Sequence, residues 1–403
     1  MTTIVHASGA AELLAAIPVL TGFAPHDSLV LLPFRGSRTA GALRFDLPAP
    51  GPDPGSLAEE FAATAVGLAC RVPDTDALAI AVYVQAPSRA AGAEAAAADP
   101  LLPAAELVAE LTLRAEACGL RVVEALHVGA DAWSDYRDPS AAPHPLAEIP
   151  AAPEVPGFAG PAPDQLSGTE LPDPGLLETE SVGRALIAVE RVLGPAGPAR
   201  KPPDGTTPVD PRAHEAALML DDLPSFLEEV LDAPEAQSPF ATAALIWILN
   251  RPALRDVALV QWACDIDLGD AALAAQLSFR ENGTQVPDDV GGIMIGHGPR
   301  PDPDRLGVAL TLVRRTIALA PRPTRAGALA AAAWLSWARG RSTHATHYLD
   351  QLDGIDPELS FAHLLRALID AGMLPDWAFE GARPAGSVTS RAGRGSSRGY
   401  RGR

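Results

Sequence analysis

Cysteine is scarce in this chain, with three residues among 403. Cys70, Cys118 and Cys264 are an odd number, lie far apart in the sequence and lack the paired spacing of a zinc site. The sequence therefore indicates neither a disulfide framework nor a zinc knuckle, and its cysteine usage is typical of a reducing compartment. We expect a cytoplasmic protein.

Long apolar runs and a leader sequence are also missing. A membrane-spanning helix needs about 18 consecutive apolar residues, and the nearest run, residues 326–338, is short and mostly alanine. The N-terminus begins Met1-Thr2-Thr3 and has neither the basic region nor the long apolar core of a signal peptide. We therefore predict no membrane association.

Positive charge is in deficit over most of the chain. The formal net charge is −19, so the folded body should repel nucleic acid and anionic membranes. The exception is the C-terminal tail, residues 381–403, which has six arginines and no acid. This tail either keeps the protein soluble or binds RNA or another polyanion in a weak, salt-dependent way. The candidate residues for polyanion binding are Arg391, Arg394, Arg398 and Arg401.

The first part of the chain alternates between strand and helix patterns. Strands are expected at residues 28–34, 42–47, 77–85 and 121–128, with helices at residues 10–20, 56–70 and 103–118. Connections of a dozen or more residues between strands are typical of crossovers. Residues 1–138 are therefore predicted to form an α/β domain with a mostly parallel sheet and flanking helices.

Prolines crowd together in residues 139–209, where a single helical pattern at 176–193 interrupts them. Proline removes amide donors and restricts its neighbours, so this segment is predicted to be a linker with one helix. Residues 210–380 show helical patterns throughout, which predicts an all-α domain of helical hairpins. The tail, residues 381–403, has too little apolar surface to fold and is predicted to be disordered.

Part of the helical domain has a tetratricopeptide-like pattern. Ala345, Leu349 and Pro357 have the spacing of a segment of that repeat. No second clear copy of the 34-residue pattern follows, so the likeness is partial.

Acidic residues at strand ends are the candidates for catalysis. His26, Asp27 and Ser28 are the residue types of a hydrolase triad, but adjacent side chains cannot form the relay. Asp27, Asp46 and Asp131 follow or precede strands and, if close together, could hold a divalent metal for hydrolysis or phosphoryl chemistry. The more ordinary interpretation is that Asp27 or Ser28 accepts backbone hydrogen bonds in a turn and that the other carboxylates are solvated.

Aromatic residues and one histidine are the candidates for binding. His26 lies at the start of a buried strand, where ligands of α/β sheets collect. Trp133 and Tyr136 lie in the loop after the last strand and could stack on a ligand or cover the sheet edge. Trp337 and Tyr348 are candidate anchors for a protein partner, with burial in the core as the alternative.

The sequence predicts no metal site and no cofactor. His344 and His347 lie three apart on an expected helix, but no third ligand follows at a matching position. The glycine cluster at residues 291–298 lacks the lysine and hydroxyl of a phosphate-binding loop, so it is interpreted as a connector between helices.

Two blocks of sequence resemble a known family. Residues 11–30 (AELLAAIPVLTGFAPHDSLV), together with the late block that runs from 310–315 (LTLVRR) through 333–340 (AWLSWARG), are similar to an uncharacterised actinobacterial family, domain of unknown function 4192. The likeness covers most of residues 3–377. Members often carry a cysteine-rich stretch after the aromatic loop, but residues 133–143 contain no cysteine, so no redox or metal role transfers. The resemblance implies an architecture and lends no activity.

Three functions stay open at this point. The helical second half favours a non-catalytic protein-interaction or scaffold protein, with a protein partner that the sequence does not identify. The alternative is a hydrolase or phosphoryl-processing enzyme that uses the carboxylates at the strand ends. The third is a protein that associates weakly with RNA through its tail.

Overall fold

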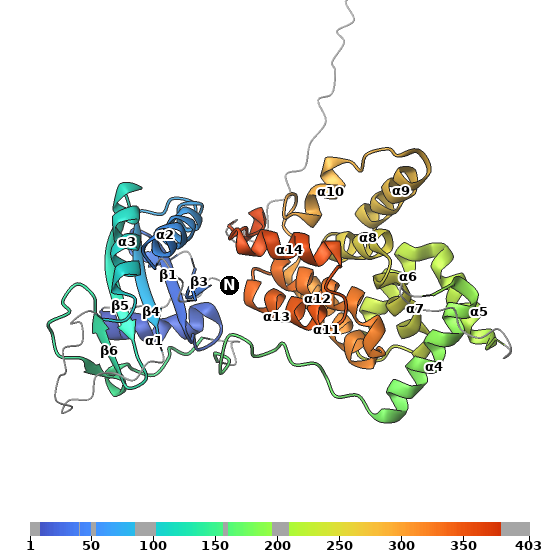
Figure 1. Cartoon of the computed structure of the whole chain (residues 1–403), viewed down its shortest axis with the longest axis horizontal. Coiled ribbons are helices and arrows are strands. Elements are labelled where there is room, and N and C mark those ends of the chain that lie inside the picture. Colours follow the sequence, from blue (N-terminus) through green and yellow to red (C-terminus); the bar gives the residue numbers. More distant parts are fainter. Residues whose placement is uncertain are drawn as a thin grey trace, which may run out of the picture.

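The computed structural model describes residues 9–39, 41–49, 54–84, 102–155, 160–195 and 209–379. An α/β region is followed by a helical region, and the two lie side by side (Figure 1). This confirms the fold class that the sequence predicted. The partial tetratricopeptide likeness is not confirmed.

Seven strands of the described chain form one sheet. They are β1 (Ser28–Arg35), β2 (Arg38–Thr39), β3 (Leu43–Asp46), β4 (Ala77–Tyr83), β5 (Arg121–Val128), β6 (Ala132–Asp135) and β7 (His144–Pro145). The strand order is β2-β1-β4-β5-β6-β7, and β3 pairs with β1 beside β2.

The sheet is mixed, whereas the sequence favoured a mostly parallel one. Among the described strands, β4 and β5 are the only parallel neighbours, and the other pairs are antiparallel. The reason is connection length, because β1 reaches β2 through residues 36–37 and β5 reaches β6 through residues 129–131. Such short links join only antiparallel strands. The crossover from β3 to β4 does join strands of like direction, but β1 lies between them.

Helices cover both faces of this sheet. The helix α1 (Ala10–Thr21) lies on one face, and α2 (Pro54–Cys70) and α3 (Ala105–Ala117) cover the other (Figure 1). The alternation of side chains along β1 explains the two cores, because successive residues of a strand point to opposite faces. Leu31 packs with α2 and α3, while Leu32 packs with α1.

The chain leaves α1 through a left-handed glycine. Gly22 has φ of 85°, and its amide donates to the carbonyl of Pro18. Glycine adopts this conformation without the steric cost that other residues incur. The turn leads through residues 23–27 into β1.

The helical region runs from α4 to α14. Its helices are α4 (Leu176–Leu193), α5 (Pro211–Met219), α6 (Leu223–Asp232), α7 (Pro239–Leu249), α8 (Pro252–Ala263), α9 (Ile266–Asn282), α10 (Asp288–Met294), α11 (Pro303–Leu319), α12 (Ala326–Ala338), α13 (Ser342–Asp353) and α14 (Ser360–Asp370). Although the sequence placed α4 in the linker, this helix packs against α5 and α7 in a shared core. None of the described helices has the length and apolar character required to cross a bilayer.

The helix α12 is the centre of the helical core. All 13 of its residues are buried, and most of them are alanine. Small side chains let neighbouring backbones approach closely, and the closest approach is at Gly327. A Cβ atom added there would lie 2.2 Å from the carbonyl oxygen of Leu249 in α7.

We expect Gly327→Ala to lower the free energy of unfolding by about 1–3 kcal/mol, because the new methyl group overpacks the contact with α7. The matched control is Gly183→Ala in α4, where a Cβ atom would meet nothing within 4 Å. That substitution should stabilise the protein by up to about 1 kcal/mol, since alanine is the better helix former. Urea denaturation followed by circular dichroism measures both. Equal effects of the two substitutions would contradict the close packing of α12 on α7.

Candidate functional site

A short segment, residues 160–170, connects the two regions and contacts both; we call it the strap. On the α/β side it pairs with the turn after α1. The amide of Ala24 donates to the carbonyl of Ala162 at 2.9 Å, and the amide of Ala162 donates to the carbonyl of Gly22 at 2.9 Å. The prolines around Ala162 favour the extended backbone that this pairing requires.

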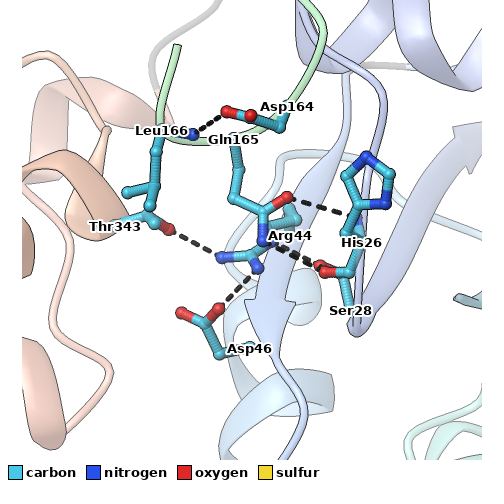
Figure 2. A network of polar contacts seen from close by, with 8 residues as sticks. All are labelled: His26, Ser28, Arg44, Asp46, Asp164, Gln165, Leu166 and Thr343. Carbon is cyan, nitrogen blue, oxygen red and sulfur yellow. Dashed lines mark hydrogen bonds and ion pairs between the residues drawn. The ribbon is translucent and has the colours of Figure 1, made fainter. Parts of the chain in front are cut away.

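The side chain of Gln165 completes this attachment (Figure 2). Its Nε2 donates to the backbone carbonyl of His26 at 3.1 Å, and its Oε1 accepts from the backbone amide of His26 at 3.2 Å. Asp164 shapes the turn, because its carboxylate accepts from the backbone amides of Leu166 and Ser167. These bonds lower the pKa of Asp164, the one from Leu166 most of all. The Gly22–Ser28 turn is thus a docking site for the strap.

On the other side the strap is bound by the helical region. The hydroxyl of Tyr348 in α13 donates to the carbonyl of Thr169 at 3.2 Å. The imidazole of His344 lies beside the backbone of Gln165, and the guanidinium of Arg314 donates to the carbonyl of Glu170. Both regions therefore hold the same few residues of backbone.

A buried arginine makes the first direct link between the regions (Figure 2). The side chain of Arg44 in β3 is 7% exposed. Its Nε donates to Ser28 Oγ at 2.8 Å, its Nη1 donates to Thr343 Oγ1 at 2.6 Å, and its Nη2 lies 2.5 Å from Asp46 Oδ1. A guanidinium out of water requires such partners. Arg44 thereby connects β1 and β3 to the first turn of α13.

A second link lies at the other end of the contact. The guanidinium of Arg71, next to the end of α2, lies 2.6 Å from the Asp376 carboxylate and over the ring of Phe379. Asp376 also accepts from His297 Nδ1 at 2.5 Å. These groups are partly exposed, so this ion pair contributes little to stability.

Between the two links, the regions enclose a cleft with two hollows of about 540 Å³ each. Both hollows are lined by six shared residues: Ala42, Leu43, Arg339, Gly340, Arg341 and Leu374. The turn Arg339-Gly340-Arg341, between α12 and α13, therefore separates them. Gly340 has φ of 74°, its amide donates to Trp337, and the amide of Arg341 donates to Ser336. This is a Schellman cap, in which glycine permits the left-handed residue.

Positive charge gathers around this turn. Burial first, and then the charges of Arg341 and Arg339, lower the pKa of His344 to about 4. Burial also lowers the pKa of Arg339, and the charge of Arg341 lowers it further. His344 is consequently neutral at physiological pH. Arg339 and Arg341 repel each other in a cleft from which water is partly excluded.

The three candidate carboxylates are not brought together. Asp46 is paired with Arg44, and Asp27 is exposed at the start of β1. Asp131 lies in the turn after β5, and β1 and β4 separate β5 from β3. Three strand spacings amount to roughly 14 Å. The described residues contain no group of three or more His, Cys, Asp or Glu side chains that could hold a metal.

The aromatic candidates of the α/β region pack on the sheet. Trp133 is 7% exposed and stacks on His144, with ring centroids 4.2 Å apart. Tyr136 is half-buried, and its hydroxyl donates to the carbonyl of Pro103 at 2.6 Å. The ring of His26 is half-buried, with Nε2 3.4 Å from the carbonyl of Pro163. His26 therefore takes part in strap docking, whereas Trp133 and Tyr136 cover the far edge of the sheet.

The aromatic candidates of the helical region are in the core. Trp337 is 1% exposed and Tyr348 is 0% exposed, so neither presents a surface to a partner. The indole of Trp337 donates to the carbonyl of Met373 at 2.8 Å. The tail arginines 391, 394, 398 and 401 lie outside the described residues.

Sequence reasoning missed the residues that matter most here. Arg44 and Gln165 carry no recognisable motif, and their partners are far away in sequence. Arg339 and Gly340 end a block that resembles the family, but that block assigned them no role. It also treated the cysteines as unrelated, whereas burial and the neighbouring thiol of Cys118 raise the pKa of Cys70 where α2 and α3 end.

The chain was compared with known protein families. Residues 11–154 and 173–376 match the family described as Domain of unknown function (DUF4192). The chain belongs to this family. The match confirms the resemblance, and the strap lies between the two matched segments of this DUF4192 protein. Comparisons with curated proteins and with solved structures gave no match.

In this DUF4192 protein, we expect Gln165→Leu to loosen the strap, because the amide and carbonyl of His26 lose their partners. The free energy of unfolding should fall by about 1–3 kcal/mol. Limited proteolysis should also cut near residues 160–170 faster. The control is Gln285→Leu, at an exposed position in the loop after α9. If both variants behave like the wild type, the strap does not hold the regions as described.

We also expect a pH-dependent loss of stability due to His344. The pKa of His344 is about 4 in the folded protein, against an ordinary value of 6.5. Between these two pH values His344 binds a proton in the unfolded chain and stays neutral in the folded one. Stability should fall as the pH drops through this window, by at most about 3 kcal/mol. His344→Gln should remove this component, whereas the exposed control His214→Gln should retain it. Chemical denaturation between about pH 7 and pH 4 measures the difference, and parallel curves for all three proteins would contradict it.

Proposed function

We propose that this DUF4192 protein is a non-catalytic binding protein that recognises its ligand in the cleft between its α/β and helical regions. The observation that carries the proposal is the pair of hollows on either side of the turn at residues 339–341, each of about 540 Å³. This volume is within the range of ligand sites, which form preferentially where two domains meet.

The weakness of the links around the cleft supports this role. The side-chain contacts Arg44–Thr343 and Arg71–Asp376 cross between the regions and are polar. The Arg71–Asp376 pair is exposed and contributes little free energy, and relative movement is the default expectation for two regions joined by a small polar interface. A ligand that touches both walls would then favour the closed arrangement.

The other functions receive less support from the geometry. A protein partner held by Trp337 and Tyr348 would need side chains that are buried. A carboxylate enzyme would need Asp27, Asp46 and Asp131 close together, and the sheet order separates Asp131 from the others. We place the binding protein in the cytoplasm on the basis of its cysteine usage.

The experiment that tests the proposal fills the cleft. Ala42 lines both hollows, so Ala42→Trp should block them, whereas the control Ala142→Trp changes an exposed loop of the α/β region. Each protein is incubated with the deproteinised small-molecule extract of the cells from which the chain comes. It is then desalted, and retained compounds are identified by mass spectrometry.

We expect the wild type and Ala142→Trp to retain the same compound and Ala42→Trp to retain about tenfold less or none. Circular dichroism shows whether all three proteins are folded. Equal retention by the two variants, or retention by none of the proteins, would overturn the proposal.

A further inference from the structure

We propose that one of the two hollows binds a phosphorylated small molecule, whose anionic groups join Arg35 of the α/β region to Arg300, Arg339 and Arg341 of the helical region. We call it the arginine-lined hollow. This inference rests on the proposed function, since it names the ligand class of that cleft.

The first observation is the charge of the lining. Four arginines line this hollow, and no aspartate or glutamate does. The chain as a whole has 50 acidic residues and a net charge of −19, so this lining is opposite in character to the rest. The neighbouring hollow differs, because Asp46, Glu60 and Asp370 line it together with arginines. The excess of positive charge is therefore confined to one hollow.

The second observation concerns what these arginines already contact. In the part of the chain that the structure describes, the side chains of Arg339 and Arg341 make no hydrogen bond or ion pair. Asp304 attracts Arg339 only from a distance. Arg35 is paired with Asp74 at 3.1 Å and donates to the carbonyl of Pro73 at 3.2 Å, but the side chains of Arg35 and Asp74 are 60% and 72% exposed. An exposed pair of this kind exchanges partners at little cost. The guanidinium donors of three arginines are therefore available to a ligand.

The third observation is that the charged side chain of Arg339 is partly buried beside a like charge. Arg339 is partly buried, and burial and the neighbouring Arg341 both disfavour its charge. A charge removed from water without a paired counter-charge is destabilising. An anion placed between Arg339 and Arg341 would relieve both effects. Guanidinium groups bind phosphate oxygens with two parallel hydrogen bonds, which makes phosphate the fitting anion.

The rest of the lining suits the organic part of such a ligand. Prolines and aromatic residues alternate with the arginines, among them Pro33, Pro301, Trp377 and Phe379. Two glycines in left-handed conformations, Gly41 and Gly340, bring backbone without side chains to the wall. A phosphate ester should therefore bind more tightly than inorganic phosphate. Because Arg35 belongs to one region and the other three arginines to the second, the bound anion also draws the two regions together.

Isothermal titration calorimetry tests this on the full chain at about 50 mM salt, with pyrophosphate, adenosine diphosphate, adenosine and citrate as probes. The decisive variant is the double substitution Arg339→Gln with Arg341→Gln. The control is Arg184→Gln with Arg280→Gln, which removes the same charge from exposed faces of α4 and α9. If the decisive variant does not fold, the single substitution Arg35→Gln, on the opposite and exposed wall, replaces it.

We expect adenosine diphosphate and pyrophosphate to bind the wild type and the control alike, and the decisive variant at least about tenfold more weakly. Adenosine should not bind, and the affinity of the phosphates should fall with salt. Hydrogen exchange should show protection of residues 35–43 and 339–343 on addition of adenosine diphosphate.

Three results would overturn the inference. The first is that the wild type binds neither pyrophosphate nor adenosine diphosphate. The second is that citrate binds as tightly as pyrophosphate. The third is phosphate binding that survives in the decisive variant and disappears when residues 381–403 are deleted, because the tail would then be the site. If the wild type binds no phosphate but still retains a compound from cell extract in a way that Ala42→Trp abolishes, the proposed function stands and only the phosphate class fails.

Discussion

The reciprocal hydrogen bonds between Gln165 and the backbone of His26 are the constraint on which the arrangement of this protein depends. The strap that contains Gln165 is also held by His344 and by Tyr348 on the other side. Because one short stretch of backbone satisfies groups in both regions, it keeps them close to each other at this edge. The cleft and its two hollows lie between this edge and the second link at Arg71, where Gly372 also packs closely against Thr64 of α2.

The buried helix α12 connects the core to the cleft. Its alanines permit close packing on every side, which fixes the position of its C-terminal end. The Schellman cap at Gly340 then turns the chain sharply and places Arg339 and Arg341 at the cleft. Two charged side chains therefore lie close together at the start and the end of one tight turn. The helix α12 therefore contributes both to the packing of the helical core and to the positions of the arginines at the cleft.

Much of the fold could be predicted from the sequence, because periodicity and capping are local. The buried strand at residues 28–34 and the helices at residues 10–20 and 176–193 needed no knowledge of distant contacts. The direction of the strands was harder to predict. It is decided by short turns such as residues 129–131, and the pattern of apolar residues does not indicate it. The candidate site could not be predicted from the sequence. Arg35 and Arg339 lie far apart in the sequence, and only the folded chain brings the ends of β1 and α12 to one hollow. In the same way, the burial of Trp337 depends on helices that surround it from all sides.

The strap also bears on how far the two halves of the chain are autonomous. A cut just before residue 160 would leave the strap on the helical half and strip Gly22, Ala24 and His26 of their backbone partners. A cut after residue 170 would leave the strap on the other half and remove partners from Tyr348 and His344. Neither half is then a complete module, and grafting the α/β half onto another helical half requires transfer of residues 160–170 with a matching surface on both sides.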